Sequence, residues 1–326
     1  MNWLKRQLLR SFNDRVGYKP QPMPEPRLWW SLRLPDGRLF AAGRNLPDSG
    51  MAFLLADGSA VPAKRLTRRD RWLGLSAAAV RRGRKQWQIF DPPPDALALA
   101  LGDRAMVFDG SGRAFDRVIR LETIRDERVI EGGSVLVEDV DVKAGELRLH
   151  NCENVLLKDV TFNGVGGPGA LEINGCRRVL SVNTTFNGTP GGVVIHDTPH
   201  WACHDLALIG THFGDTMAGV NRSECVVIEN ESRAFERIIF DQSSHGTAGG
   251  FVVWDAFPMD VTISHSSLPD LYFAAGAEMV RWMFWSAEFH RVGVRDDGET
   301  KPWDQMLKDS GSYMFGLKHY APRGGD

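Results

Sequence analysis

Residues that can bind a ligand or transfer a proton recur at matching positions in a series of short segments. The segments read LRLH, LEIN, VVIH, VVIE and FVVW and start at residues 147, 171, 193, 226 and 251. Their first and third residues are apolar, so in a β-strand the second and fourth residues face the opposite side. These outward positions form two columns, Arg148, Glu172, Val194, Val227, Val252 and His150, Asn174, His196, Glu229, Trp254.

A face of this composition is suited to an extended sugar chain. Arg148 could bind a uronate carboxylate, and His150 or His196 could then act as the base of an elimination or epimerisation. Glu172 and Glu229 lie two segments apart, so we expect about 10 Å or more between them, poor for a retaining glycosidase and marginal for an inverting one. The candidate catalytic residues are Arg148, His150, Glu172, His196 and Glu229, and the candidate substrate-binding residues are Asn174, Trp254, Arg68 and Arg69. The competing explanation is that solvent-facing strand positions are polar in any protein.

The segments belong to a repeat that must position them. LHNCENVLLKDVTFNG at residue 149 and INGCRRVLSVNTTFNG at residue 173 agree at a constant offset of 24 residues, and further copies begin at Asp205, Arg237 and Asp260. Aligned, they give an apolar column (Val155, Val179, Leu206, Ile238, Val261), a polar column (Asp159, Asn183, Gly210, Gln242, His265) and a bulky column (Phe162, Phe186, Phe213, His245, Leu268). Strands of about five residues cannot bury an apolar face alone. Each copy is therefore predicted to be one coil of a parallel β-solenoid.

Two positions of the repeat have further consequences. The Asp159 and Asn183 column is expected at a turn, where small polar side chains can hydrogen-bond from coil to coil. Cys152 and Cys176 occupy one position in consecutive coils. Their spacing would permit a disulfide by distance, but we predict thiols packed in the core.

The repeats resemble those of the right-handed parallel β-helix superfamily, the pectate-lyase-like fold, over about residues 117–292. The similarity lies in CENVLLKDVTFNG and CRRVLSVNTTFNG. A leucine-rich repeat is the rival, and it fails because Asn154 and Arg178 stand where leucine should recur. The resemblance implies a protein that handles polysaccharides. The aspartate-rich signature of polygalacturonases, the Asp-Pro-His-Asp of alginate epimerases and the calcium-binding aspartates of pectate lyases are missing, which weakens the case for an enzyme.

The rest of the chain divides around this solenoid. Residues 1–24 are predicted to form an N-terminal arm with a short basic amphipathic helix. Residues 25–116 are predicted to form a small β-rich domain with hairpins around PDG and ADG that caps the first coil. The solenoid occupies residues 117–292, and residues 293–326 form a C-terminal cap with a short helix, followed by a tail. The fold class is therefore all-β, a right-handed parallel β-helix preceded by a small β-rich domain.

Charge is distributed unevenly along the chain. The 326 residues have a formal net charge of −2, which gives no general reason to expect nucleic acid. Residues 64–85 nevertheless hold nine Lys and Arg against Asp70 alone. With residues 1–16, this segment could contact an anionic membrane surface, an acidic glycan or, less plausibly, nucleic acid; a solvated basic face is the alternative.

Other features restrict cofactors and location. Four cysteines without a C-x-x-C pair, and the histidines of HDTPHWACH in a turn, predict neither a metal nor another cofactor. No secretory signal or membrane-spanning run is recognisable, so we expect a cytoplasmic or peripheral membrane protein, with a virion as a further option. An oligomer is compatible with the sequence.

Two functions follow. The first is a carbohydrate-active protein, a lyase, epimerase or hydrolase, acting on an acidic polysaccharide along the β-helix face. The alternative is a non-catalytic β-helix for binding or scaffolding, such as a polysaccharide-assembly accessory or a phage tail component.

Overall fold

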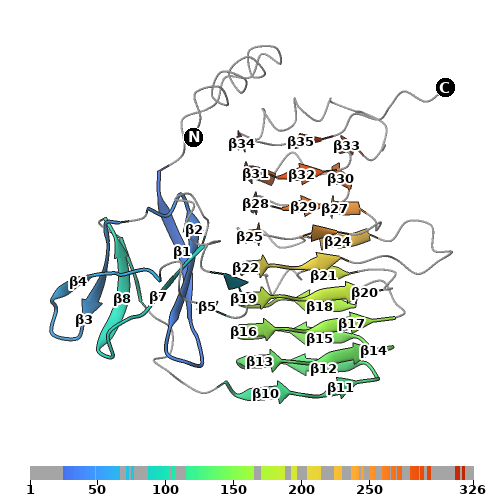
Figure 1. Ribbon diagram of the computed structural model, residues 1–326, viewed down its shortest axis with the longest axis horizontal. Coiled ribbons are helices and arrows are strands. Elements are labelled where there is room, and N and C mark those ends of the chain that lie inside the picture. The colour runs from blue at the N-terminus through green and yellow to red at the C-terminus, as the bar shows by residue number, and fades with distance from the viewer. Residues whose placement is uncertain are drawn as a thin grey trace, which may run out of the picture.

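The protein is a stack of parallel coils with a small antiparallel part at its side (Figure 1). The computed structural model describes residues 25–47, 49–66, 71–72, 75–76, 87–102, 104–107, 115–164, 170–187, 192–196, 204–213, 224–229, 236–241, 244–245, 250–254, 259–264, 266–268, 270–273, 280–285, 287–289, 292–294, 313–315 and 318–319. Every element within these ranges is a strand, and they contain no helix that could cross a membrane. The predicted all-β fold with a parallel β-helix is confirmed.

Three walls of parallel strands make up the solenoid, and the chain visits them in turn. The first wall is a nine-stranded sheet of β10 (Arg117–Arg120), β13 (Val135–Glu138), β16 (Glu153–Lys158), β19 (Arg177–Val182), β22 (His204–Ile209), β25 (Glu236–Asp241), β28 (Met259–Ser264), β31 (Val280–Trp285) and β34 (Tyr313–Phe315). The second is a six-stranded sheet of β11 (Thr123–Ile124), β14 (Asp141–Lys143), β17 (Thr161–Asn163), β20 (Thr185–Asn187), β23 (His212–Phe213) and β26 (Ser244–His245), followed by a three-stranded sheet of β29 (Ser267–Leu268), β32 (Glu288–Phe289) and β35 (Lys318–His319). The third is an eight-stranded sheet of β12 (Arg128–Glu131), β15 (Leu147–His150), β18 (Leu171–Asn174), β21 (Val193–His196), β24 (Glu224–Glu229), β27 (Gly250–Trp254), β30 (Asp270–Phe273) and β33 (Val292–Val294).

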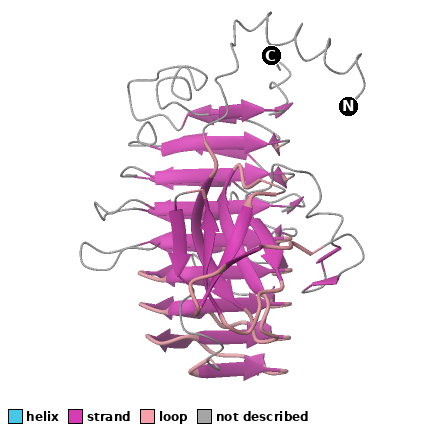
Figure 2. Cartoon of the chain, turned by 90° about the vertical axis from the view of Figure 1, so that its left-hand side faces the viewer, coloured by secondary structure: helices cyan, strands magenta, loops and turns pink. Residues whose placement is uncertain are grey.

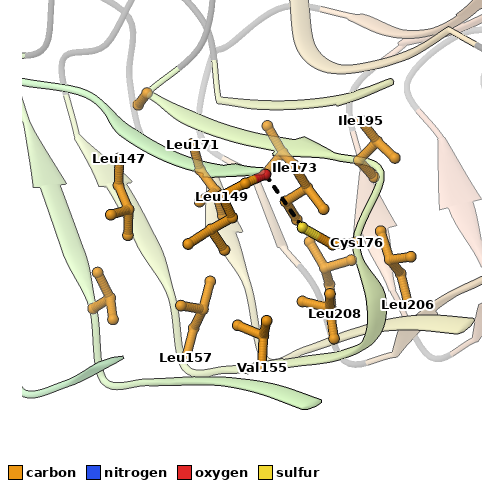
Figure 3. Close-up of a cluster of buried hydrophobic side chains, with 14 of the residues drawn as sticks. Leu147, Leu149, Val155, Leu157, Leu171, Ile173, Cys176, Ile195, Leu206 and Leu208 are labelled. Carbon is orange, nitrogen blue, oxygen red and sulfur yellow. Dashed lines mark hydrogen bonds between the residues drawn. The ribbon is translucent and has the colours of Figure 1, made fainter. Parts of the chain in front are cut away.

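The coils stack in the predicted register. Val155 pairs with Val179, and the same column continues through Leu206, Ile238 and Val261. All of these side chains are fully buried. Figure 3 shows such residues from neighbouring coils pointing into one shared interior. The apolar column is therefore the core of the solenoid, formed by side chains that are distant in sequence.

The polar column lies at the turn that follows the nine-stranded sheet. Asp159 and Asn183 both have a φ of 53°, and Gly210 has a φ of 65°. Asn, Asp and Gly tolerate this left-handed backbone better than other residues. The Asn183 side-chain amide donates a hydrogen bond to Asp159 Oδ1 at 3.0 Å. This confirms the predicted contact between turns of consecutive coils.

The predicted core position of the two cysteines is also confirmed. Cys152 and Cys176 are fully buried, and neither is in a disulfide.

The N-terminal part consists of small antiparallel sheets, and both predicted hairpins are present. One sheet contains β1 (Arg27–Arg33), β2 (Leu39–Arg44) and β7 (Trp87–Phe90); another contains β3 (Met51–Leu55), β4 (Ala60–Pro62), β8 (Ala96–Leu101) and β9 (Arg104–Val107); the third contains β5 (Arg71–Trp72) and β6 (Leu75–Ser76). Every residue of β2 is buried. Its Leu39 and Ala41 pack with Phe53 and Leu99 of the second sheet, whereas Phe40 and Ala42 face the solenoid.

The described N-terminal strands lie along the side of the solenoid and not over its first coil, where the sequence analysis placed them. Trp30, Phe40 and Trp87 form a hydrophobic cluster with outward side chains of the nine-stranded sheet, which are Leu136, Leu156, Leu180, Val182, Ala207 and Ile209. Figure 2 shows the N-terminal strands running across the coils. The physical reason is that the nine-stranded sheet is apolar on both faces over these coils, so its outer face also needs a cover.

The first coil has a charged residue at an inward position of its strand. Arg128 occupies a core column, because it pairs with Leu147 of the next coil. Its guanidinium instead forms an ion pair with Glu122 at 2.8 Å, and both side chains are substantially exposed. A charged residue at an inward position of an edge strand is a recognised protection against further strand pairing.

At the other end, the solenoid continues beyond the predicted boundary at residue 292. β34 pairs with β31, and β35 pairs with β32, so both extend the walls already described. The predicted C-terminal helix and the N-terminal arm fall outside the described residues.

Candidate functional site

The outward face of the eight-stranded sheet holds four of the predicted site residues with described side chains. Arg148 pairs with Glu172 and His150 pairs with Asn174 across β15 and β18. Leu147 and Leu149, which alternate with them, are buried in the core, so the alternation of the strand directs Arg148 and His150 outward. The predicted juxtaposition of these four residues is confirmed.

Arg148 is surrounded by carboxylates. Its guanidinium donates two hydrogen bonds to Glu146 Oε2, at 3.0 Å from Nε and 2.7 Å from an Nη atom. The other Nη atom lies 3.1 Å from Glu127 Oε1, and Nε lies 3.3 Å from Glu172 Oε2. The hydrogen bonds that Arg148 donates to Glu146, and the negative charges of all three carboxylates, raise the pKa of Arg148, while burial opposes this. The guanidinium is therefore fixed in the charged state by protein groups.

Glu172 joins this ion pair to the imidazole of His150. Glu172 Oε1 lies 3.0 Å from His150 Nε2, while its other carboxylate oxygen faces Arg148. Glu172 is mostly buried, with 19 % of its side chain exposed, and His150 is 29 % exposed. A carboxylate that accepts a hydrogen bond from one ring nitrogen fixes the tautomer of the imidazole and leaves the other nitrogen for proton transfer. We refer to Glu127, Glu146, Arg148, His150 and Glu172 as the Arg148 cluster.

The sequence analysis did not identify two members of this cluster. Glu146 and Glu127 immediately precede strands of adjacent coils, β15 and β12. Glu146 could have been found from its position, because residues two apart in an extended chain face the same side and Glu146 stands two before Arg148. Glu127 had no such signal, since its contact depends on how the coils stack.

The remaining predicted site residues are placed only in part. The backbones of His196, Glu229 and Trp254 continue the Asn174 column in the predicted register. Their side chains lie outside what the structure describes. Arg68 and Arg69 also fall outside the described residues, as do residues 1–16 and most of the basic segment 64–85.

The described residues contain no group of three or more His, Cys, Asp or Glu side chains arranged to hold a metal ion. His200 of the histidine-rich segment is not among these residues.

Comparisons of the chain with protein-family models, with curated proteins and with solved structures found no match.

Proposed function

We propose that this protein is a β-solenoid binding module that holds an extended, uncharged carbohydrate chain along the outward face of its eight-stranded sheet. The observation that carries the proposal is the engagement of Arg148 by Glu127, Glu146 and Glu172. This makes the cluster a pre-formed polar surface rather than a set of reactive groups awaiting substrate. We also propose, from the resemblance of the repeats, that the solenoid is of the pectate-lyase-like type.

The charge of the cluster argues for an uncharged ligand. A uronate would need a cation that is not already paired, whereas the one guanidinium here contacts three carboxylates. An acidic polysaccharide would have to displace one of them and would then face the remaining negative charges. Sugar hydroxyls can instead donate to the carboxylate oxygens and accept from Asn174, without breaking the ion pairs.

A second candidate function is acid–base catalysis on the same face, and the observation that favours it is the 3.0 Å contact between His150 Nε2 and Glu172 Oε1. His150 would act as the base and Glu172 would orient it. In this scheme Arg148 holds Glu172 in place, and it would be a positioning residue.

Affinity electrophoresis in gels containing neutral or acidic polysaccharides tests the proposed function. We expect retardation by at least one neutral polysaccharide, and at least a tenfold weaker interaction for Asn174→Ala. The matched control is Asn187→Ala, which changes an exposed asparagine on the six-stranded wall. Retardation only by acidic polysaccharides, or equal losses in the two variants, would contradict the proposal.

Assays for reducing ends and for unsaturated uronate products separate the two candidates. The binding module gives neither product with any polysaccharide in the panel. Product formation that His150→Ala abolishes would favour catalysis, with Asn187→Ala again as the control.

Contact with an anionic membrane surface, through residues 1–16 and 64–85, is a separate proposal. It rests on the excess of Lys and Arg in the second segment. Binding to anionic vesicles should weaken steadily with added salt, because screening reduces contacts between exposed charges.

A further inference from the structure

Cys152 and Cys176 lie one above the other inside the solenoid. Each immediately precedes a strand of the nine-stranded sheet, and the residues that follow them, Glu153 and Arg177, pair in register. Both cysteines are fully buried. The two sulfur atoms thus occupy equivalent positions in consecutive coils, shielded from solvent.

The surroundings of both thiols are backbone carbonyls and apolar side chains. Cys152 Sγ donates to His150 O at 3.3 Å and to Ile130 O at 3.4 Å. Cys176 Sγ donates to Leu149 O at 3.2 Å, the hydrogen bond drawn in Figure 3. A hydrogen bond with Cys176 lowers the pKa of the Cys152 thiol, the charge of Arg117 adds to this, and burial opposes it.

The spacing of the coils suits a bridging ion better than a disulfide. Neighbouring parallel strands are about 4.8 Å apart, and equivalent side chains in register keep about that separation. A disulfide requires Cβ atoms about 3.5–4.5 Å apart, so the coils would have to approach each other. Two metal–sulfur bonds of about 2.3 Å, the length of a zinc–thiolate bond, span about 4.6 Å when placed end to end.

We propose that Cys152 and Cys176 form a two-coordinate binding site for a soft monovalent metal ion of the Cu(I) type. Sulfur ligands select such ions over hard cations. On binding, one thiol releases its proton to solvent and bonds to the metal as a thiolate, and the second sulfur donates a lone pair as a thiol. The charges of one thiolate and one monovalent cation cancel, as burial in an apolar interior requires. Because both sulfur atoms are enclosed, the ion enters while the coils assemble.

The test uses the full chain with Cys203→Ser and Cys225→Ser, so that only the stacked pair remains. This parent is refolded without oxygen in the presence of Cu(I), reductant and a competing chelator, and the bound copper is then counted. We expect one copper per chain, with two sulfur neighbours detected by X-ray absorption. We also expect a higher unfolding temperature than for the metal-free parent, because an ion that binds only the folded state stabilises it.

Removal of either sulfur should abolish the site. Copper content should fall at least tenfold in Cys152→Ala and in Cys176→Ala, whereas Val179→Ala, which also shortens a buried side chain of the same coil, should retain it. Copper content unchanged in both cysteine variants would overturn the proposal. If the variants do not fold, the parent protein alone decides. The proposal would be overturned if the folded parent bound no copper, or if its copper had fewer than two sulfur neighbours. It would also be overturned if the mass of the parent were lower by two hydrogens, which would show that the two cysteines form a disulfide.

Discussion

Phe162 and Phe186 lie face to face in consecutive coils, with ring centroids 4.8 Å apart and ring planes inclined by only 7°. They pair in register across β17 and β20, and both are buried. The separation of the rings is close to the spacing between parallel strands of about 4.8 Å. Identical aromatic residues at equivalent positions therefore stack without distorting the coils.

Replacement of Phe162 tests the contribution of this stack. Phe162→Ala should lower the free energy of unfolding by about 3–5 kcal/mol, because it removes a fully buried aromatic side chain and leaves a cavity. Phe162→Leu keeps most of the apolar volume and should cost clearly less. Denaturant unfolding of both variants provides the measurement, and equal losses in the two variants would contradict the cavity explanation, because Phe162→Leu keeps most of the volume.

The left-handed turn at Asn183 provides a second prediction. Asn183→Ala should lose about 1 kcal/mol from backbone strain at positive φ and a similar amount from the hydrogen bond to Asp159. Asn183→Gly retains the backbone conformation and should lose mainly the hydrogen bond. Denaturant unfolding should therefore rank the wild type above Asn183→Gly and Asn183→Gly above Asn183→Ala. The reverse order of the two variants would refute a strain contribution.

Acid should weaken the solenoid through Glu138. The hydrogen bond from Lys158 Nζ, together with the charges of Lys158 and Arg120, lowers the pKa of Glu138 from its ordinary value of 4.5, against the opposing effect of burial. A carboxyl whose pKa is lower in the folded state stabilises the fold above its unfolded pKa, and this contribution is lost as the pH falls through the folded pKa. Unfolding free energy should therefore decline below about pH 4.5.

The matched variant for this prediction is Lys158→Met, which keeps an unbranched side chain without the charge. Between pH 3 and pH 6, its unfolding free energy should depend less on pH than that of the wild type. Parallel curves for the two proteins would mean that Glu138 gains nothing from Lys158.

The N-terminal sheet and the solenoid should unfold together. Leu180 is fully buried between them, so Leu180→Asp would place a carboxylate among Trp30, Phe40 and other apolar side chains. In the wild type, tryptophan fluorescence and far-UV circular dichroism should give coincident transitions. The variant should unfold in separate steps, with fluorescence changing first. Coincident transitions at the wild-type midpoint in this variant would refute the importance of the contact.

The sequence predicted the stacking of the coils in detail because the information is local and repeated. Val155 and Val179 are spaced by one coil, and the strand alternation around them determines which side chains meet. The same rule places Leu147 in an inward column and Arg148 in an outward one. The sequence therefore predicted correctly that Arg148 and His150 share one face, although it did not predict all of their contacts.

The sequence analysis missed two kinds of contact that the repeat does not encode. One is the packing on the outer face of the nine-stranded sheet, and the other is the ion pairing of Arg148 with a neighbouring coil. Val155, Leu156 and Leu157 are consecutive apolar residues, a pattern typical of a strand buried on both faces. That signal could have shown that a second layer covers the outer side of the nine-stranded sheet. It could not have shown which segment does so, because the packing of Trp30 against Leu156 depends on the shapes of two separate units. The engagement of Arg148 by Glu127 was hidden for the same reason.

Arg128 has a consequence for how these molecules behave at high concentration. A stack of identical layers has no intrinsic limit to its length, and the uncovered edge of one molecule could serve as the template for another. Any molecule that docked on this edge would have to bury the guanidinium where its own core needs a leucine. The charge therefore opposes end-to-end growth, to which a fold of stacked coils is otherwise well suited.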